Sequence, residues 1–223
     1  MLELYAVNIE KFISEDQYNK LLNKVSKEQQ SRIKQFRFID DAKRTLCGEV
    51  LIRFLACQKL SLKNSDIIIE RNEYGKPFLK EYPYFHYNIS HSGKWVVVAI
   101  SDQAIGVDIE QIKSIDMNIA RWYFAINECN SIIREVLKKQ QETFYFLWTA
   151  KESYTKYIGK GLLMPLNSFS ILKEERYSTV NIDRDCLIQT IVIDDYILST
   201  CHSRASKDWP LLIKEIYLEE VKL

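Results

Sequence analysis

The sequence predicts an α+β fold built of two similar halves, residues 1–103 and 104–223. The first observation is that a helix followed by strands occurs in both halves. The second is a short echo, in which Ala42-Lys43-Arg44-Thr45 matches Ala150-Lys151-Glu152-Ser153 about half a chain length later. Four positions can coincide by chance, but a true duplication would give a pseudo-twofold molecule with a ligand cleft between its halves.

The composition is that of a folded chain in a reducing compartment. Of the 223 residues 47% are hydrophobic, and 31 basic residues against 30 acidic ones leave a net charge of +1. A chain so close to neutral has no overall positive electrostatic field that would attract a nucleic acid. The five cysteines form no C-x-x-C pair and predict neither disulfides nor a zinc site. No signal peptide and no apolar run of roughly 20 residues is found, so we expect a cytoplasmic protein without a membrane span.

The first half is predicted to begin with a strand over residues 2–9 and a helix over 14–25. A clearer helix begins at Asp40-Asp41, the expected N-terminal caps, and ends near residue 60. Strand and turn signals then follow: residues 67–69, the turn Asn72-Glu73-Tyr74-Gly75-Lys76-Pro77 and the β-branched run over 95–100.

The second half repeats this order. A strand is predicted over 105–109, a helix over 118–137 and a stronger helix over 142–158. Three strand-like segments complete it: residues 169–171, 187–193 and 196–201.

The segment Gly106-Val107-Asp108-Ile109-Glu110 is the first candidate site. Side chains alternate along a strand, so Asp108 and Glu110 emerge on one face while Val107 and Ile109 pack on the other. Converging carboxylates raise each other's pKa unless a cation neutralises them, and hard oxygen ligands suit Mg²⁺. On spacing alone, a solvated strand face with two unrelated acids is the commoner explanation of so short a string.

The stronger helix carries the second candidate site. At 3.6 residues per turn, Trp148, Glu152 and Lys156 share a flank beside the apolar stripe. Lys151 falls within the stripe, where it must snorkel or meet an anion. An ordinary amphipathic helix with a Glu152–Lys156 pair also explains this pattern. The segment Gly159-Lys160-Gly161 at the end of the helix favours a ligand site over an ordinary helix, because its glycines permit close approach of the backbone to a ligand.

The third candidate is a short polar turn predicted between strand-like runs, over residues 85–95. It gathers Asn, Ser, His and Lys side chains that can hydrogen-bond a phosphate. Capping of local backbone explains His91 equally well. A Ser–His–Asp hydrolase is disfavoured, because Ser90 and His91 of an extended chain point to opposite faces and no G-x-S-x-G elbow is present. A basic cluster over 27–44 is explained by a solvated helix face.

In this order and at these separations, the segments resemble one family. YNISHSGKWVVVAIS, IGVDIE and FLWTAKESYTKYIGKGL are similar to the three motif blocks of Sfp-type 4′-phosphopantetheinyl transferases. AKRTLCGEVLIR, NEYGKPF and IARWYFAINE extend the match over most of residues 26–170. The resemblance implies the 4′-phosphopantetheinyl transferase fold, two α+β halves about a pseudo-twofold axis, with coenzyme A in the cleft between them.

The resemblance also implies an activity and its site residues. The phosphopantetheine arm of coenzyme A would move to a serine of an acyl, peptidyl or aryl carrier protein, with release of 3′,5′-ADP. Asp108, Glu110 and Glu152 would bind the required Mg²⁺, and Glu152, His91 and Lys156 would be catalytic. The residues implied to contact coenzyme A are Arg32, Arg44, Thr45, Gly75, Lys76, Ser90, His91 and Lys156.

Two details of this site stay open at the level of sequence. Gln29 stands where better-known members often place a lysine that grips the 3′-phosphate, and Arg32 keeps a cation nearby. One such contact is worth about 1–3 kcal/mol. The attacking serine also needs a proton acceptor. Glu152 or a metal-bound water could serve, because a carboxylate on Mg²⁺ has a depressed pKa and is a poor base.

The partner surface is predicted over residues 119–124, where aromatic side chains stand beside an arginine. The resemblance implies an acidic carrier helix as partner, and we predict docking through Arg121, Tyr123 and Phe124. A helix with its aromatics in the core explains the pattern as well. We expect a monomer that binds neither nucleic acid nor membrane.

Two other functions remain open, a Mg²⁺-dependent phosphodiesterase or nuclease and a non-catalytic relative that only binds carriers. The near-zero net charge disfavours the first, and the presence of all three acids with His91 disfavours the second. These motifs do not identify the carrier protein or its pathway, and they do not determine whether acylated coenzyme A is accepted.

Overall fold

The computed structural model describes residues 2–11, 14–160, 164–171, 179–180, 186–204 and 212–223. Within these residues, no helix is long and apolar enough to cross a membrane. Short 3₁₀ helices connect the larger elements at Ile9–Lys11, Asn64–Asp66, Met117–Ile119, Leu166–Ser168 and Leu218–Glu220.

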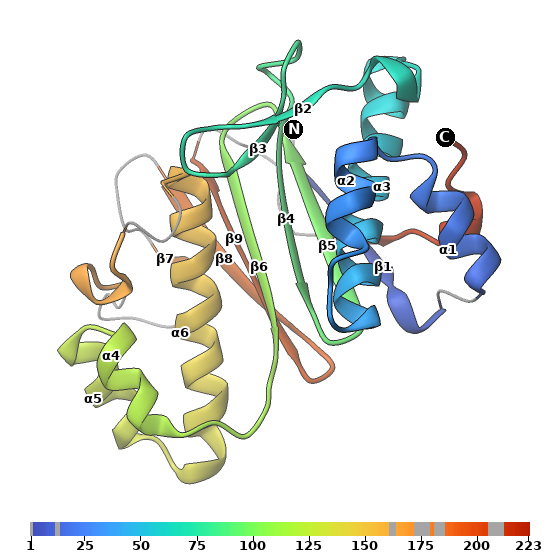
Figure 1. Ribbon diagram of the computed structural model, residues 1–223. Helices are drawn as coiled ribbons and strands as arrows, with labels where there is room; N and C mark the ends of the chain where they lie inside the picture. Colours follow the sequence, from blue (N-terminus) through green and yellow to red (C-terminus); the bar gives the residue numbers. More distant parts are fainter. Residues whose placement is uncertain (1, 12–13, 161–163, 172–178, 181–185, 205–211) are drawn as a thin grey trace.

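The first half of the chain forms a four-stranded sheet covered by one long helix. The sheet has the order β10-β1-β5-β4. Helix α3 packs against it, and the shorter α1 and α2 lie beside α3 (Figure 1). The bounds are β1 Leu2–Asn8, α1 Glu15–Leu22, α2 Lys27–Ile33, α3 Ile39–Leu60, the hairpin β2 Ile69–Arg71 with β3 Pro77–Leu79, β4 His86–Ser92, β5 Trp95–Ser101 and β10 Ile213–Glu215.

The second half repeats the plan of a sheet with a long helix. Its sheet has the order β6-β9-β8-β7, and α6 packs on β6 and β9. The bounds are β6 Ile105–Gln111, α4 Ala120–Tyr123, α5 Ile126–Arg134, α6 Leu137–Ile158, β7 Thr179–Val180, β8 Cys186–Ile193 and β9 Tyr196–Ser203. In Figure 1, α3 and α6 stand on either side of the line where β4 and β6 meet.

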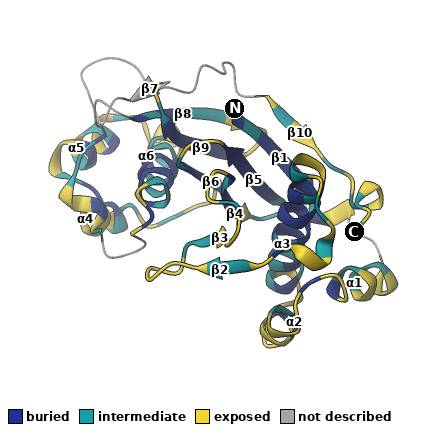
Figure 2. Ribbon diagram, turned by 90° about the horizontal axis from the view of Figure 1, so that it is seen from above, coloured by how far each residue is buried: buried dark blue, intermediate teal, exposed yellow. Residues whose placement is uncertain are grey.

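A shared apolar core joins the two sheets. In β5, Val96, Val98 and Ile100 face α3, whereas Val97 and Ala99 join side chains of β1, β6 and β9 in a second cluster. Both faces of β5 are therefore buried, which explains the continuous apolar run in its sequence (Figure 2). The same cluster takes the alternate apolar residues of β6, so its acids face the other way.

The structure confirms the fold class and corrects several predicted elements. The N-cap of α3 is Phe38, in extended conformation, so Asp40 and Asp41 lie in the first turn of the helix. Their negative charges interact favourably with the helix dipole, but neither residue is the cap. The helix predicted over 118–137 is broken at Phe124, which is extended because its ring packs in the core against Phe144. Helix α6 begins at Leu137, five residues earlier than the sequence predicts.

Two further corrections concern strands. The polar segment 85–95 is not a turn, because most of it forms strand β4. Residues 169–171 form no strand. The end of the chain also crosses the predicted boundary, since β10 pairs in parallel with β1 and thereby returns residues 212–223 to the first half.

Candidate active site

The three candidate segments of the sequence converge on one cavity of about 330 Å³ at the line where β4 meets β6. Strands β4 and β6 and helix α6 each supply part of its wall. The lining residues are Ile89, Ser90, His91, Asp108, Glu110, Trp148, Glu152 and Lys156. Every residue predicted to be catalytic or to bind the metal is in this set.

Strand β6 and helix α6 bring three acids to the cavity. Asp108 is 4% exposed, while Val107 and Ile109 are buried on the opposite face, as the alternation predicts. Burial raises the pKa of Glu110, and the negative charge of Asp108 raises it further. The pKa of Glu152 is raised for the same two reasons, in the same order. The site therefore holds acids that favour either protonation or a nearby cation.

Lys156 is the cation closest to Asp108. Its Nζ donates to Asp108 Oδ1 at 2.6 Å, to Ser90 Oγ at 3.1 Å and to the Val107 carbonyl oxygen at 3.1 Å. The sequence raised a Glu152–Lys156 pair within the helix, but the lysine reaches across to β6 instead. Helix α6 is thus tied to the strand that carries the acids.

His91 lies on β4 in a positively charged setting. Its side chain is exposed at the mouth of the cavity. Partial desolvation by its neighbours lowers its pKa most, and the charges of Arg44 and Lys156 lower it further. Arg44 is itself held by the Gly93 carbonyl oxygen at 2.8 Å and by Asp41 at 2.5 Å. The imidazole is therefore uncharged at neutral pH, and it can donate or accept one hydrogen bond without adding charge.

The donor set of the cavity suits a hard divalent cation in its chemistry. Asp108 Oδ2 is buried and has no hydrogen-bond partner, so it offers an oxygen to a ligand. The side chains nevertheless do not stand as a ready-made site. Within the described ranges, no three His, Cys, Asp or Glu side chains are grouped closely enough to hold an ion.

A second cavity of about 330 Å³ follows the first along β4 and α6, and it contains Lys76. Lys76 Nζ donates to the carbonyl oxygens of Ile105 at 3.1 Å and Lys156 at 2.5 Å, and burial lowers its pKa to about 8. The preceding Gly75 has φ +83°, the left-handed conformation that favours glycine in the β2–β3 turn. Lys76 therefore bridges the two halves.

The remaining predicted contacts of coenzyme A lie outside both cavities. Arg32 is exposed on α2, and Thr45 is half-buried on α3. Gly161 lies outside the described residues. A contact of Arg32 or Thr45 with a ligand stays a prediction.

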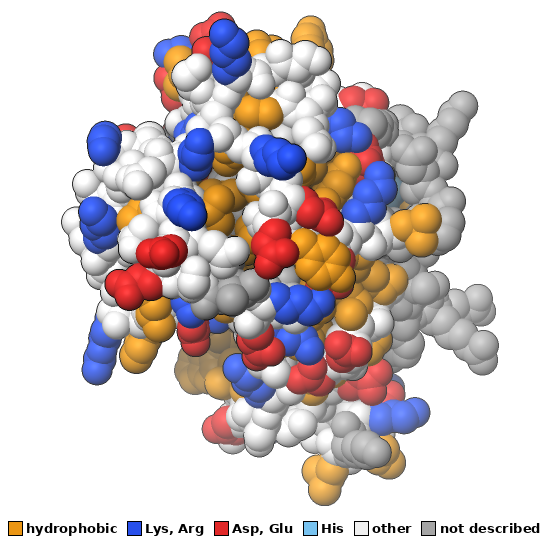
Figure 3. Space-filling model, turned by 90° about the vertical axis from the view of Figure 1, so that its right-hand side faces the viewer, with side chains coloured by type: hydrophobic (Ala, Val, Ile, Leu, Met, Phe, Trp, Pro, Cys, Tyr) orange, Lys and Arg blue, Asp and Glu red, His pale blue; other side chains and the backbone are white. Residues whose placement is uncertain are grey.

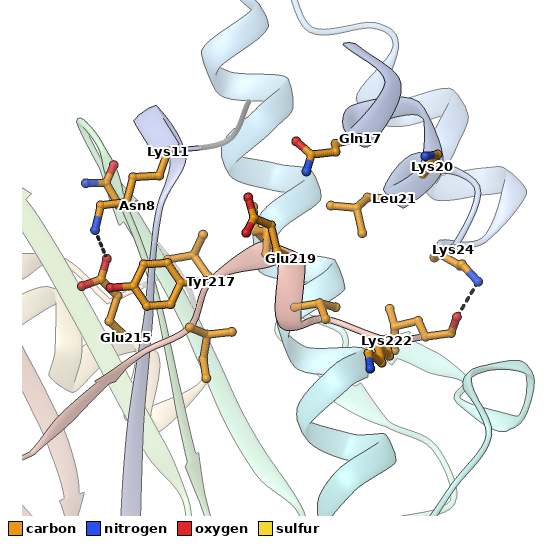
Figure 4. Close-up of a pocket in the computed structure, with 15 residues that line it drawn as sticks. Asn8, Lys11, Gln17, Lys20, Leu21, Lys24, Glu215, Tyr217, Glu219 and Lys222 are labelled. Atoms are coloured by element: carbon orange, nitrogen blue, oxygen red, sulfur yellow. Dashed lines mark hydrogen bonds and ion pairs between the residues drawn. The ribbon is translucent and has the colours of Figure 1, made fainter. Parts of the chain in front are cut away.

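A larger cavity, about 590 Å³, lies elsewhere, between α1 and the C-terminal segment (Figure 4). An ion pair of Lys11 with Glu215 and a hydrogen bond from Lys24 to Leu223 cross its rim. None of the predicted site residues lines it. The face seen in Figure 3 mixes side chains of both charge signs, in keeping with the net charge of +1.

Helix α6 is anchored on its other side by Lys151. The ammonium group is fully buried and pairs with the equally buried Glu128 of α5 at 2.8 Å. It also donates to the Leu166 and Phe169 carbonyl oxygens. The sequence predicted that Lys151 must either snorkel or meet an anion, and the structure shows the second outcome, with Glu128 as the anion. This pair fixes the turn of helix that also carries Glu152.

The predicted docking residues differ in exposure. Tyr123 is 44% exposed and Arg121 is exposed, but Phe124 is only 3% exposed and packs against Phe144 and Trp148. Phe124 therefore cannot present its ring to a partner, which corrects the prediction for this residue. Trp122, which lies in the predicted segment but was not among the three docking residues singled out, is 77% exposed.

The sequence reading missed the role of the polar residues of β4. Asn88, Ser90 and Ser92 lie at alternate positions, and all three bond to β6. Alternation at a period of two would have placed them on one face of a strand. The interpretation of this segment as a turn concealed that signal.

Comparison with known proteins places this arrangement in one family. The model described as 4′-phosphopantetheinyl transferase, N-terminal, matches residues 13–103, and that of the 4′-phosphopantetheinyl transferase superfamily matches residues 104–201. The chain is 36% identical over 208 residues to the 4′-phosphopantetheinyl transferase ffp of Bacillus subtilis, which covers 91% of this chain and 93% of that protein.

Two further relatives agree. The chain is 34% identical over 225 residues to the 4′-phosphopantetheinyl transferase Sfp of Bacillus subtilis strain 168, covering 99% of this chain and all of that protein. It is 42% identical over 180 residues to the 4′-phosphopantetheinyl transferase gsp of Aneurinibacillus migulanus, covering 81% and 75% of the two chains. The likeness thus extends over nearly the whole length.

Proposed function

The chain belongs to the 4′-phosphopantetheinyl transferase superfamily, and we propose that it moves the phosphopantetheine arm of coenzyme A to a serine of a carrier protein. The product is the holo carrier protein, and 3′,5′-ADP is released. The observation that carries the proposal is the meeting of β4, β6 and α6 around Asp108, Glu152 and Lys156 in one cavity.

The charges of the cavity suit a diphosphate. We propose that Lys156 binds a phosphate oxygen of coenzyme A while it holds Asp108, with one of its three donors exchanging Ser90 or the Val107 carbonyl oxygen for the phosphate. The uncharged imidazole of His91 would donate a hydrogen bond to the same group. Both contacts stabilise the negative charge that builds up as the phosphorus is attacked.

We propose a Mg²⁺ ion on Asp108, Glu110 and Glu152. The support is the unpartnered Asp108 Oδ2 and the raised pKa values of the two glutamates, since a nearby cation would favour their charged forms. When bound, the ion would neutralise phosphate oxygens and favour departure of 3′,5′-ADP. Because no three acids of the described residues are grouped closely enough as they stand, Glu152 on α6 would have to move toward the acids of β6 to complete the set.

We propose Glu152 as the proton acceptor. Its carboxylate lines the cavity and can take the proton on an oxygen that does not hold the cation, although a bound cation lowers its pKa and so weakens it as a base. The serine oxygen forms a bond to the pantetheine-side phosphorus as its proton passes to Glu152. The bond from that phosphorus to the bridging oxygen breaks, and the electron pair leaves with 3′,5′-ADP.

We propose that the nucleotide end of coenzyme A extends toward the second cavity, next to Gly75 and Lys76. This cavity follows the first along the same strand and helix, which supports the direction. The carrier would dock on Arg121, Trp122 and Tyr123, which are exposed on α4. Arg121→Glu should raise KM for the carrier protein, whereas Arg134→Glu, an exposed change on α5, should not.

The function is tested by the intact mass of apo carrier proteins incubated with coenzyme A, Mg²⁺ and the enzyme. We expect a gain of one phosphopantetheine arm. Asp108→Asn should lower the rate by about 100-fold or more, because it removes a charge at the reacting centre. Asp102→Asn, a change at an exposed acid outside the cavity, is the control. Wild-type inactivity toward a broad carrier panel would contradict the proposal and favour the non-catalytic relative.

A further inference from the structure

Side chains, rather than a backbone ladder, connect β4 to β6. The side-chain oxygen of Asn88 accepts from the Val107 N–H at 2.8 Å, and that of Ser90 from the Ile109 N–H at 3.3 Å. That of Ser92 accepts from the Gln111 N–H at 3.1 Å. Three alternate residues of one half thus satisfy three alternate N–H groups of the other half.

The two serines also hold the acids. Ser90 Oγ donates to Asp108 Oδ1 at 2.8 Å, and Ser92 Oγ donates to Glu110 Oε2 at 2.7 Å. Each hydroxyl therefore accepts from the backbone N–H of one β6 residue and donates to the acid that directly precedes that residue in the chain. Two residues further along the strand, the same arrangement occurs with the next serine and the next acid.

This geometry follows from hydroxyl chemistry. A serine hydroxyl has one donor and two acceptor sites, so accepting the N–H fixes the oxygen and leaves its hydrogen for the carboxylate. An edge strand also needs partners for its outward N–H groups. Each serine side chain here provides the acceptor for the N–H group and the donor for the carboxylate. The orientation of the carboxylate therefore depends on the register between β4 and β6.

We infer that Ser92 is a positioning residue, which from the first half orients Glu110 of the second half for binding of a divalent cation. The inference rests on the proposed function of the acids. Ser90 has the same relation to Asp108, but its oxygen also accepts from Lys156, so all of its bonding capacity is used. Among the contacts of the described residues, the Ser92 hydroxyl bonds only to β6, which makes Ser92 the cleaner position to change.

The test is binding of Mn²⁺, followed by electron paramagnetic resonance, to the full-length protein with coenzyme A and without carrier. Loss of an outer partner of a metal ligand typically weakens metal affinity by 10–100-fold, and we expect this weakening for Ser92→Ala. Ser92→Thr keeps the hydroxyl and should bind Mn²⁺ within about threefold of wild type. Ser101→Ala removes a similar side-chain bond to backbone outside the site, and it should also match wild type.

Transfer kinetics supply a second readout. The Mg²⁺ concentration for half-maximal activity should rise with Ser92→Ala, while KM for the carrier protein stays unchanged. If Ser92→Ala does not fold, Ser92→Cys keeps the volume with a weak donor and should show the same loss. Wild-type affinity in both Ala and Cys variants would overturn the inference. No Mn²⁺ bound by the wild type beyond that held by coenzyme A would instead refute the proposed metal site, and with it the inference.

Discussion

At the scale of single residues, Asp108 has the largest influence on the electrostatics of the cavity. It holds Lys156 through Oδ1, raises the pKa of both glutamates and keeps Oδ2 without a partner. Such an arrangement is costly to the apo fold, because like charges share a partly buried space. It is the kind of local conflict expected where a ligand completes the structure.

Glu152→Gln should raise the melting temperature at pH 7 by a few degrees while it removes most of the transferase activity. The pKa of Glu152 in the folded chain lies above its ordinary value of 4.5, so ionised Glu152 disfavours the folded state. This cost is present at pH 7 and is lost as the pH falls below about 4.5, where both states are protonated.

Thermal unfolding at pH 7 and pH 4 measures the difference, without added metal. Glu142→Gln, at an exposed acid of the same helix, is the control. A stabilisation of equal size at both pH values would show that charge at Glu152 is not its cause.

Lys151→Met should lower the free energy of unfolding by about 3–5 kcal/mol, because it leaves the buried Glu128 carboxylate without its cation. Glu128 also accepts the Ala125 and Ile171 N–H groups, so the change should loosen α5 and the segment before residue 171. Urea denaturation gives the value. The double variant Lys151→Met/Glu128→Gln should recover part of the loss, and a double variant as unstable as the sum of both changes would argue against the pair.

At the scale of elements, the approach of α6 to β6 decides whether the acids and Lys156 share a cavity. A Cβ atom at Gly106 would lie 2.0 Å from the Ser153 carbonyl oxygen and 2.5 Å from the Tyr157 nitrogen. Both are backbone atoms of α6 and cannot turn aside. Glycine at this position therefore permits the contact that places Glu152 and Lys156 next to Asp108.

Gly106→Ala should cost about 1–3 kcal/mol or more and should lower kcat more than it raises KM for coenzyme A, because α6 must move away from β6. Gly48→Ala is the matched control. Its Cβ would meet the Ile89 side chain at 3.0 Å, which can shift, and alanine favours a helix interior by about 1 kcal/mol. Denaturation and steady-state kinetics of both variants test this. Equal effects at the two positions would contradict the argument.

At the scale of the whole molecule, the halves are joined by an apolar cluster between the sheets and by the polar side chains of β4. Lys76 adds a bond to the Ile105 carbonyl oxygen across the same line, and Lys156 adds one to Ser90 Oγ. We therefore expect the two halves to unfold together, in one transition.

Asn88→Ala should lower the free energy of unfolding by about 1–3 kcal/mol, because it leaves the buried Val107 N–H without a partner. Urea unfolding followed by tryptophan fluorescence and by circular dichroism should still coincide. Asn8→Ala removes an exposed bond to the Glu10 N–H within one half and should cost much less. Separate transitions in the wild type would contradict a joint unfolding of the halves.

Much of this architecture could be predicted because local patterns carry it. Alternation in 106–110 placed Asp108 and Glu110 on one face, and helical spacing placed Trp148, Glu152 and Lys156 on one flank. All five residues line the same cavity. The prediction failed where packing overrides pattern. Phe124 breaks a helix because its ring packs in the core. The polar residues of 85–95 suggested a turn, although most of them form a strand that pairs with β5.

The sequence by itself determined the family, the two-part α+β plan and which residues carry chemistry, since the periods of strand and helix fix the face on which each side chain lies. Only the tertiary structure decided which faces meet. In the folded chain, Lys156 pairs with Asp108 rather than with Glu152, and the serines of β4 donate hydrogen bonds to the acids of β6. These contacts depend on the register between the sheets and on the close approach at Gly106, which arise from long-range packing and leave no local period in the chain.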